Sequence, residues 1–374
     1  MSLEPLNLDP AHCRARQERL CEQLAKHSID RAVIVSHENV QWLTGFRPHR
    51  LMQAAVSLEA DGKCTLAAPN EEPEHAAADR IVTFEAQWHC TLRQEQLAVA
   101  TKLLADTVGR ERERLGIEHA APSPHVLSAF GIDSASNDRL VDLDPTLWQL
   151  RRRKDPDELA MIRRAVDCTE AMYARAREII TPGITELQVF SELHAAAVNV
   201  AGEPLVALGN DYQCNSPGGP PRDRPAQAGE LFVLDLGPCY RGYYADNCRT
   251  IAVSGQPTDA QQQAWEAIVA VLDLVEQTVR PGTSARDLFA QAKAMLDAHL
   301  PGGFPHHLGH GFGLFPHEAP HLNPHWNDQF EAGDTFTAEP GLYTDDLRAG
   351  IRLEQDYLVT ADGVERLTNF PLEL

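Results

Sequence analysis

Residues 305–320 concentrate imidazole side chains in a short stretch, Pro-His-His-Leu-Gly-His-Gly-Phe-Gly-Leu-Phe-Pro-His-Glu-Ala-Pro. Four of the sixteen histidines of the chain lie here: His306, His307, His310 and His317. Imidazole is the commonest side-chain metal ligand and titrates near neutral pH. Glycines between the histidines let the backbone bring several rings to one centre and leave room for a substrate. The stretch therefore predicts a binding site rather than a solvated loop.

Two acidic residues interrupt otherwise apolar, strand-like segments. Asp235 lies in Phe-Val-Leu-Asp-Leu-Gly and Glu339 in Phe-Thr-Ala-Glu-Pro-Gly; a companion acid follows each, Asp246 after 11 residues and Glu354 after 15. A hairpin return of this length can bring the two acids of each pair side by side. A buried carboxylate without a counter-charge is strongly unfavourable, so each pair needs a cation.

Four such carboxylates and one imidazole make a ligand set for metal ions. The set suits two divalent ions of intermediate hardness, namely manganese, cobalt, iron or zinc, with shared carboxylates bridging them. The alternative is a group of surface salt bridges from the acids to Arg249 and Arg352. We expect these two arginines instead to fix the carboxylates from behind.

An internal repeat covers the C-terminal part of the chain. Residues 182–185 (Pro-Gly-Ile-Thr) recur as 281–284 (Pro-Gly-Thr-Ser) at an offset of 99, and residues 228–237 recur as 332–341 at an offset of 104. Pro-Gly opens many helices and Ala-Gly-acid forms many turns, but two matched blocks in the same order argue against coincidence. We expect a duplicated helix-helix-strand-strand unit with the acid of each apolar strand at equivalent positions.

The segment before the repeat is predicted to be a mixed α/β unit, separated from it by the charged run 151–158. That run predicts a solvated helix entry, in which Asp155-Pro156 starts a long helix to about Ile180. We expect one domain over 1–150 and a second over 151–374. The expected N-terminal elements are a helix from Asp9-Pro10 to about His27, a strand at 31–36, a helix at 38–46 closed by Gly45, hairpin strands at 54–60 and 63–68 around Asp61-Gly62, a strand at 80–85, a helix at about 91–108 and a strand near 139–144.

Composition restricts the class of protein and its partners. The chain has 374 residues, 43% hydrophobic and 23% charged, and no run approaches the roughly 20 apolar residues of a membrane span. The net charge of −21 argues against binding to nucleic acid or to an anionic membrane, since both require a basic face. Eight scattered cysteines without a Cys-x-x-Cys pair or a secretory segment favour reduced thiols, and hence a cytoplasmic protein.

In combination, the motifs resemble those of the pita-bread metallopeptidases, most closely the Xaa-Pro branch that contains prolidase and aminopeptidase P. They are Asp-x-Gly at Asp235, Asp-x-x-Arg-Thr at Asp246, His-x-x-Gly-His-Gly-x-Gly ending at Gly313, Glu-Pro-Gly at Glu339 and Arg-x-Glu at Arg352. The resemblance covers essentially the whole chain. It implies an α+β protein in which a creatinase-like α/β domain precedes a pseudo-twofold pita-bread catalytic domain. It also implies a homodimer, with manganese as the first choice of metal.

The resemblance assigns roles to individual residues. The implied metal ligands are Asp235, Asp246, His310, Glu339 and Glu354, with Asp246 and Glu354 bridging two ions. His317 is implied to bind the substrate and stabilise the tetrahedral intermediate, and His306 is a further active-site histidine. Glu339 is also implied to carry a proton from water to the leaving nitrogen. Arg352 and Tyr343 are expected to contact the substrate.

The function implied is metal-dependent hydrolysis of Xaa-Pro peptide bonds by a water that two ions activate. Two alternatives are a pita-bread enzyme that acts on a small non-peptide molecule, such as a dimethylsulfoniopropionate lyase, and a non-catalytic binding protein. Retention of all five ligands argues against the second alternative and against a creatinase, which lacks them.

The sequence departs from the family pattern at one place. The family usually has another histidine in the loop before the first metal strand, where Asn215 is expected to stand in this chain. An amide can donate a hydrogen bond but cannot transfer a proton. The substrate side therefore differs from the family pattern, and both dipeptidase and aminopeptidase activities remain open.

Overall fold

The computed structural model describes residues 4–110, 114–121, 124–132, 139–253, 255 and 257–374. The chain divides into two compact units: Asn7–Arg151, and Arg152–Leu374 together with the segment that ends at Leu6. Among the described residues, every helix is too short or too polar to cross a lipid bilayer.

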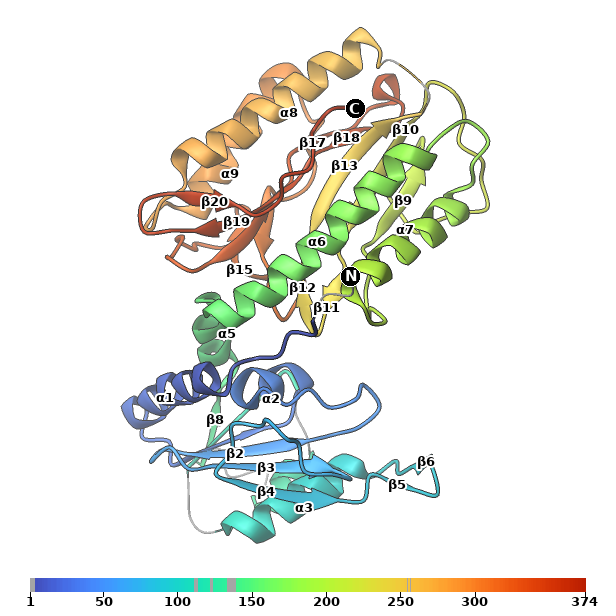
Figure 1. Cartoon of the computed structure of the whole chain (residues 1–374). Helices are drawn as coiled ribbons and strands as arrows, with labels where there is room; N and C mark the ends of the chain where they lie inside the picture. Colours follow the sequence, from blue (N-terminus) through green and yellow to red (C-terminus); the bar gives the residue numbers. More distant parts are fainter. Residues whose placement is uncertain (1–3, 111–113, 122–123, 133–138, 254, 256) are drawn as a thin grey trace. The chain divides into compact units, whose positions relative to one another are not determined.

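A six-stranded mixed sheet forms the centre of the unit Asn7–Arg151 (Figure 1). Its strand order is β4-β3-β2-β1-β7-β8, in which β1 is antiparallel to β2 and parallel to β7. The elements are α1 (Pro10–Lys26), β1 (Arg31–Ile34), α2 (His37–Thr44), β2 (Ala55–Glu59), β3 (Cys64–Pro69), β4 (Arg80–Phe84), β5 (Gln87–Trp88), β6 (Thr91–Leu92), α3 (Gln96–Val108), β7 (Leu115–Ile117), α4 (Pro124–Ala129), β8 (Leu140–Asp142) and α5 (Asp144–Arg152).

Most of the expected elements of this unit are present. The carboxylate of Asp9 accepts a hydrogen bond from the backbone N–H of Ala11 at 2.8 Å at the start of α1, and Gly45 closes α2 with a φ of 75°. The helix expected from residue 91 is too long, because Gln87–Leu92 forms the β5–β6 hairpin and α3 begins only at Gln96. Strand β7 has three residues, Leu-Gly-Ile, too few to show a periodic pattern, and was not predicted.

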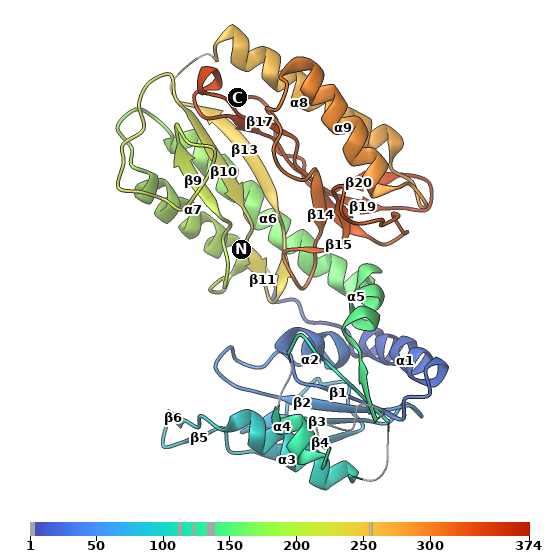
Figure 2. The ribbon, with the colours of Figure 1, turned by 180° about the vertical axis from the view of Figure 1, so that it is seen from behind.

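The second unit consists of two halves, each with a helix pair lying along its own sheet (Figures 1 and 2). The sheets have the orders β13-β10-β9 and β15-β14-β16-β19-β20. The elements are α6 (Pro156–Ile179), α7 (Glu186–Ala201), β9 (Asp211–Cys214), β10 (Leu231–Leu236), β11 (Cys239–Tyr240), β12 (Tyr243–Tyr244), β13 (Asn247–Ala252), α8 (Asp259–Thr278), α9 (Ala285–His299), β14 (Gly309–Gly311), β15 (Glu318–Leu322), β16 (Thr335–Ala338), β17 (Gly341–Leu342), a 3-10 turn (Asp345–Leu347), β18 (Ile351–Arg352), β19 (Gln355–Val359) and β20 (Val364–Arg366).

The predicted repeat extends to individual backbone hydrogen bonds. The N–H of Gly183 donates to the carbonyl of Ala226 at 2.8 Å, and the N–H of Gly282 donates to the carbonyl of Phe330 at 2.8 Å. Each half also contains an additional strand before the predicted hairpin, β9 in the first half and β14 in the second. The repeated unit is therefore larger than the predicted helix-helix-strand-strand unit.

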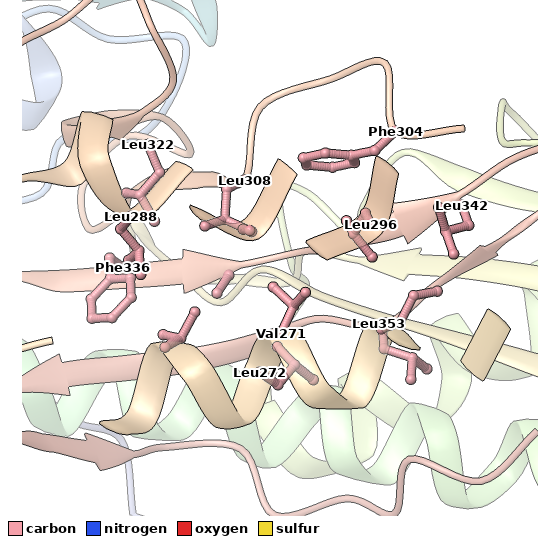
Figure 3. Close-up of a cluster of buried hydrophobic side chains, with 14 of the residues drawn as sticks. Val271, Leu272, Leu288, Leu296, Phe304, Leu308, Leu322, Phe336, Leu342 and Leu353 are labelled. Atoms are coloured by element: carbon pink, nitrogen blue, oxygen red, sulfur yellow. The ribbon is translucent and has the colours of Figure 1, made fainter. Parts of the chain in front are cut away.

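A buried hydrophobic cluster supports the strands of the second half (Figure 3). Val271 and Leu272 of α8 and Leu288 and Leu296 of α9 pack against the sheet, where Phe336 of β16 is completely buried. Burying one such side chain contributes about 1.5–3 kcal/mol. This packing fixes β16, the strand that leads directly into Glu339.

Most of the charged run 151–158 is buried, contrary to the sequence-based expectation, although Arg153 and Pro156 are exposed. Arg152 donates to both carboxylate oxygens of Asp334, with Nε–Oδ1 at 2.9 Å and Nη2–Oδ2 at 2.6 Å. Lys154 Nζ lies 3.1 Å from Glu318 Oε2, and both side chains are buried. The charges of Arg152 and Lys154 are buried because each has a partner in the second half of the repeat, and these two pairs anchor the start of α6.

We predict that Arg152→Met destabilises the protein by about 3–5 kcal/mol, because it leaves the carboxylate of Asp334 buried without its counter-charge. Urea unfolding measures the free energy. Arg163→Met is the matched control, since Arg163 pairs with Glu365 at the surface and should contribute less than about 1 kcal/mol. Equal losses in the two variants would contradict the prediction.

Candidate metal centre

The five predicted metal ligands lie at the ends of the central strands of the two halves. Asp235 lies within β10, and Asp246 immediately precedes β13, its antiparallel neighbour. Glu339 follows the last residue of β16 and Glu354 precedes the first residue of β19, and these two strands also pair. His310 is the middle residue of β14. The duplicated fold thus directs two acid pairs towards one region.

The structure brings these side chains within ligand distance of one another. One carboxylate oxygen from each of Asp235, Asp246 and Glu354 forms a group whose members lie within 4.8 Å of each other. His310 Nε2 lies 3.6 Å from Asp246 Oδ2 and 3.6 Å from Glu339 Oε1. His310 therefore connects the acid pair of the first half to that of the second.

The tautomer of His310 shows which ring nitrogen faces the carboxylates of Asp246 and Glu339. Its Nδ1 is 3.0 Å from the carbonyl oxygen of Gly311, so Nδ1 carries the proton and Nε2 presents a lone pair. Burial holds the pKa of His310 well below its usual value, which keeps the ring neutral. A lone pair facing two carboxylates at 3.6 Å is repulsive unless a cation lies among them. The donor set therefore fits a metal ion.

Burial also raises the pKa values of the acids. The pKa of Glu339 is raised to about 8, while those of Asp246 and Glu354 lie well above their usual values because of burial and mutual repulsion. Oδ1 of Asp235 and Oε2 of Glu354 are buried, and no donor among the described residues hydrogen-bonds to them. Such oxygens are available to coordinate a cation, and divalent ions of the kind that accept carboxylate and imidazole fit this set.

The guanidinium of Arg352 is engaged by two acids, whereas the sequence predicted that it would contact the substrate. Its Nη2 donates to Oδ2 of Asp235 at 2.8 Å and also contacts Oδ2 of Asp211. Asp211 faces Asp235 across the β9–β10 pair and was not predicted; an acid at the start of a four-residue strand gave no distinguishing signal. Thr337, two residues before Glu339 and hence on the same strand face, contacts Oε1 of Glu354 and was also missed.

Arg249 does not fix the carboxylates, contrary to expectation. It contacts the backbone carbonyl of Glu354 and donates to the carbonyls of Phe370 and Pro371 at 2.8 and 3.0 Å. It also donates to the side-chain oxygens of Asn247 and Gln355, each at 2.9 Å, and these partners are amides rather than carboxylates. Arg249 therefore anchors the C-terminal segment beneath the site.

Tyr343 and His306 extend the network away from the acids. Arg352 Nη1 donates to the hydroxyl of Tyr343 at 3.1 Å, and that hydroxyl lies 3.0 Å from Nε2 of His306. His306 Nδ1 is 2.8 Å from the carbonyl of His307, so Tyr343 is the donor to Nε2. Burial lowers the pKa of His306 to about 4, so its ring is neutral at physiological pH.

The remaining histidines of the 305–320 stretch face the same region. His317 stacks on His310 with ring centroids 3.7 Å apart, and it can group with Asp246 and His310 around one ion. His307 Nε2 lies 3.7 Å from Glu339 Oε1. Sequence reasoning gave His307 no specific role, although its place between two assigned histidines was a signal.

Two glycines of the stretch allow close approach of the backbone, in agreement with the first part of the expectation. A Cβ on Gly309 would lie 1.9 Å from the carbonyl oxygen of Thr337, and one on Gly311 would lie 2.1 Å from that of Ala319. These glycines let β14 approach its neighbouring strands closely, and so set the position of His310 between them.

Asn215 lies at the end of β9 with a left-handed φ of 51°, and its backbone N–H donates to the carbonyl of Leu231 at 2.9 Å. It lines an open cavity of about 740 Å³ together with Pro217 and Tyr343. Gly218 comes closer to the charged network, because a Cβ there would lie 2.5 Å from Oδ2 of Asp211. The loop thus opens beside the network that joins Arg352 to the acids.

Family models match both the N-terminal unit and the unit that contains the candidate ligands. The model of metallopeptidase family M24 matches residues 160–361, and that of the creatinase/prolidase N-terminal domain matches residues 16–153. The chain belongs to metallopeptidase family M24. It is therefore a peptidase of a family that uses divalent metals, with a creatinase-like N-terminal domain and a pita-bread catalytic domain, as the sequence predicted.

Individual relatives agree with this membership. An uncharacterized peptidase of Staphylococcus aureus strain USA300 is 30% identical over 361 residues, covering 94% of this chain and 98% of that protein. The structure of a prolidase from Pyrococcus horikoshii OT3 is similar with a TM-score of 0.80 at 25% identity, over 96% of this chain and 99% of that one. Dipeptidase PepE from Mycobacterium ulcerans has a TM-score of 0.80 at 26% identity, over 98% of both chains.

We predict that manganese stabilises this M24 peptidase more at high pH than at low pH. Glu339 has a folded-state pKa of about 8 against a usual 4.5, so folded, metal-free protein retains a proton that the unfolded chain releases. The stability that this proton confers is greatest below about pH 4.5 and is lost as the pH rises towards about 8. Divalent cations bind the deprotonated acids, so they should restore the stability that the metal-free protein loses at high pH.

Thermal midpoints measured with EDTA and with manganese at about pH 5.5 and about pH 8 test this linkage. The manganese-induced shift should be larger at the higher pH. An equal shift at both values would mean that the buried acids are already ionised in the metal-free protein.

We predict that metal content separates the roles of Asp246 and His317. Asp246→Asn should lose bound metal and activity together, because Asp246 contributes to two of the ligand groups. His317→Ala should retain its metal and lose turnover by about 10²–10³-fold, the range typical of removing a group that stabilises the transition state. Elemental analysis of dialysed protein is the measurement, and loss of metal in His317→Ala would make His317 a ligand instead.

Proposed function

We propose that this protein hydrolyses Xaa-Pro peptide bonds with two divalent ions, manganese being the first choice. The residues that would hold the ions are Asp235, Asp246, His310, Glu339 and Glu354. The observation that carries the proposal is the neutral His310, whose Nε2 lone pair faces two buried carboxylates. The similarity to a prolidase and a dipeptidase supports the choice of substrate.

The chemistry divides between the bound ions and the side chains of the chain. Divalent ions would supply a water of lowered pKa and polarise the scissile carbonyl. Glu339, whose Oε1 lies 3.6 Å from Nε2 of His310, is the carboxylate proposed to take a proton and return it to the leaving nitrogen. His317, stacked on His310, is placed to hydrogen-bond the oxygen on which charge develops.

We propose that the network beside Glu339 orients the substrate. Tyr343 accepts from Arg352 and donates to Nε2 of His306, so the lone pair of that ring is engaged in a hydrogen bond. Arg352 is engaged by Asp211 and Asp235, and we propose that it orients Asp235 rather than binding the substrate directly. Tyr343 lines the open cavity and is the member of this network placed to contact the peptide.

A tertiary Xaa-Pro nitrogen has no N–H, so peptidases that hold their substrate through that donor lose a contact with it. Here the proposed contacts are to the carbonyl oxygen and to the leaving nitrogen as a proton acceptor. We further propose residues 151–374 as the catalytic domain, 1–150 as the accessory domain, and a cytoplasmic homodimer. The free thiols of all eight cysteines support a reducing compartment.

We predict that manganese-loaded protein hydrolyses Ala-Pro and the tripeptide Ala-Pro-Gly, that EDTA abolishes the activity, and that Ala-Ala is not cleaved. Liquid chromatography of the released amino acids measures turnover, and the ratio of the first two rates separates dipeptidase from aminopeptidase. Dimethylsulfoniopropionate is the competing substrate. Turnover of that compound without cleavage of any Xaa-Pro peptide would overturn the proposal.

A further inference from the structure

Two loops occupy equivalent places in the two halves of the catalytic unit. In the first half, the N–H of Glu186 at the start of α7 donates to the carbonyl of Arg224 at 3.1 Å. In the second half, the N–H of Ala285 at the start of α9 donates to the carbonyl of Asp328 at 3.0 Å. Segments 215–225 and 319–329 are therefore pseudosymmetric neighbours of the metal centre.

The two loops differ in what they present. The first reads Asn-Ser-Pro-Gly-Gly-Pro-Pro over residues 215–221, without an aromatic ring, and borders the open cavity of about 740 Å³. The second segment carries a ring pair, His321 of strand β15 and Trp326 of the loop that follows it, with centroids 4.7 Å apart and planes inclined by 19°. One side of the site is thus open and the other is lined by stacked rings.

The ring pair is rigidly held. Oδ2 of Asp328 accepts hydrogen bonds from both the backbone N–H and Nδ1 of His321, each at 2.8 Å. Arg286 donates to the backbone carbonyl of Trp326 at 3.1 Å, which ties the loop to α9. A surface fixed in this way loses little conformational entropy when it binds a ligand.

One member of the ring pair lies on the same side of the sheet as a candidate ligand. His321 lies opposite His310 in the β14–β15 pair, and directly opposed residues share a sheet face. His310 in turn stacks on His317. Trp326, at the outer end of this series of rings, remains 47% exposed and therefore available to a ligand.

The direction of the peptide follows from the proposed role of Glu339. If Glu339 returns a proton to the proline nitrogen, the proline lies on the side of Glu339, near His306 and its hydrogen-bond partner Tyr343, which borders the open cavity. The preceding residue then extends to the opposite side of the metal centre, towards His317 and the ring pair.

We propose that His321 and Trp326 form the binding surface for the side chain of the residue that precedes proline, and that this surface favours an aromatic side chain. The inference rests on the proposed Xaa-Pro activity. Aromatic rings gain from offset stacking or edge-to-face contact beyond the area that they bury. Such a contact corresponds to a preference of about 2- to 10-fold for Phe-Pro over Ala-Pro in kcat/KM.

The test compares kcat/KM for Phe-Pro and Ala-Pro in manganese-loaded wild type, Trp326→Ala and Trp326→Phe. We expect the preference for Phe-Pro to disappear in Trp326→Ala and to persist in Trp326→Phe, which retains a ring. Trp148→Ala is the matched control, because Trp148 is comparably exposed but lies in α5. It should retain the wild-type ratio. Elemental analysis verifies that each variant carries the same amount of metal.

The outcomes separate this inference from the function on which it rests. No turnover of either dipeptide by the wild type would overturn the proposed function. Turnover with no preference for Phe-Pro, or with a preference that Trp326→Ala retains, would overturn the ring pair as the side-chain site while leaving the Xaa-Pro activity intact.

Discussion

The confinement of negative charge in the interior of the catalytic unit is the constraint on which the rest of the structure depends. Glu339 and Glu354 are buried, Asp235 and Asp246 are largely so, and the buried carboxyl of Asp356 lies nearby. Arg352 supplies one positive charge to this group. Carboxylates so close together are stable as anions only with further positive charge, which gives the site its affinity for divalent cations.

The backbone is arranged to bring the acids this close. The acids lie within or just beyond paired strands, so that their carboxylates converge where the sheets of the two halves meet. The β14 strand contributes His310 between them, at a depth set by the absence of side chains at Gly309 and Gly311. Helices α8 and α9 hold these strands from the outer side through apolar packing. Strand pairing therefore sets the positions of the acids, and side-chain contacts such as those of Arg352 and Thr337 orient their carboxylates.

Much of this arrangement could be predicted from the sequence because it is encoded in local pattern and in the repeat. Apolar strands interrupted by single acids, Pro-Gly helix entries and the Asp61-Gly62 hairpin all have short-range physical causes. The contacts that escaped prediction are those between segments distant in the chain. Asp211 meets Arg352 across 141 residues, and Lys154 meets Glu318 across 164, so neither pair leaves a periodic signal. The burial of the 151–158 run and the actual partners of Arg249 were misjudged for the same reason.

The division of the ligands between the two halves has a consequence for the stability of the protein. Two of the proposed ligands, both acids, come from the first half, and two acids and the imidazole come from the second, so unfolding of either half would release bound ions. Stability then increases with free metal as RT ln(1 + [L]/Kd), about 2.7 kcal/mol at a hundredfold excess over Kd. The Asn7–Arg151 unit has its own core and none of the five ligands. Metal supply would therefore govern the lifetime of one part of the chain, making the abundance of active enzyme responsive to metal starvation independently of catalysis.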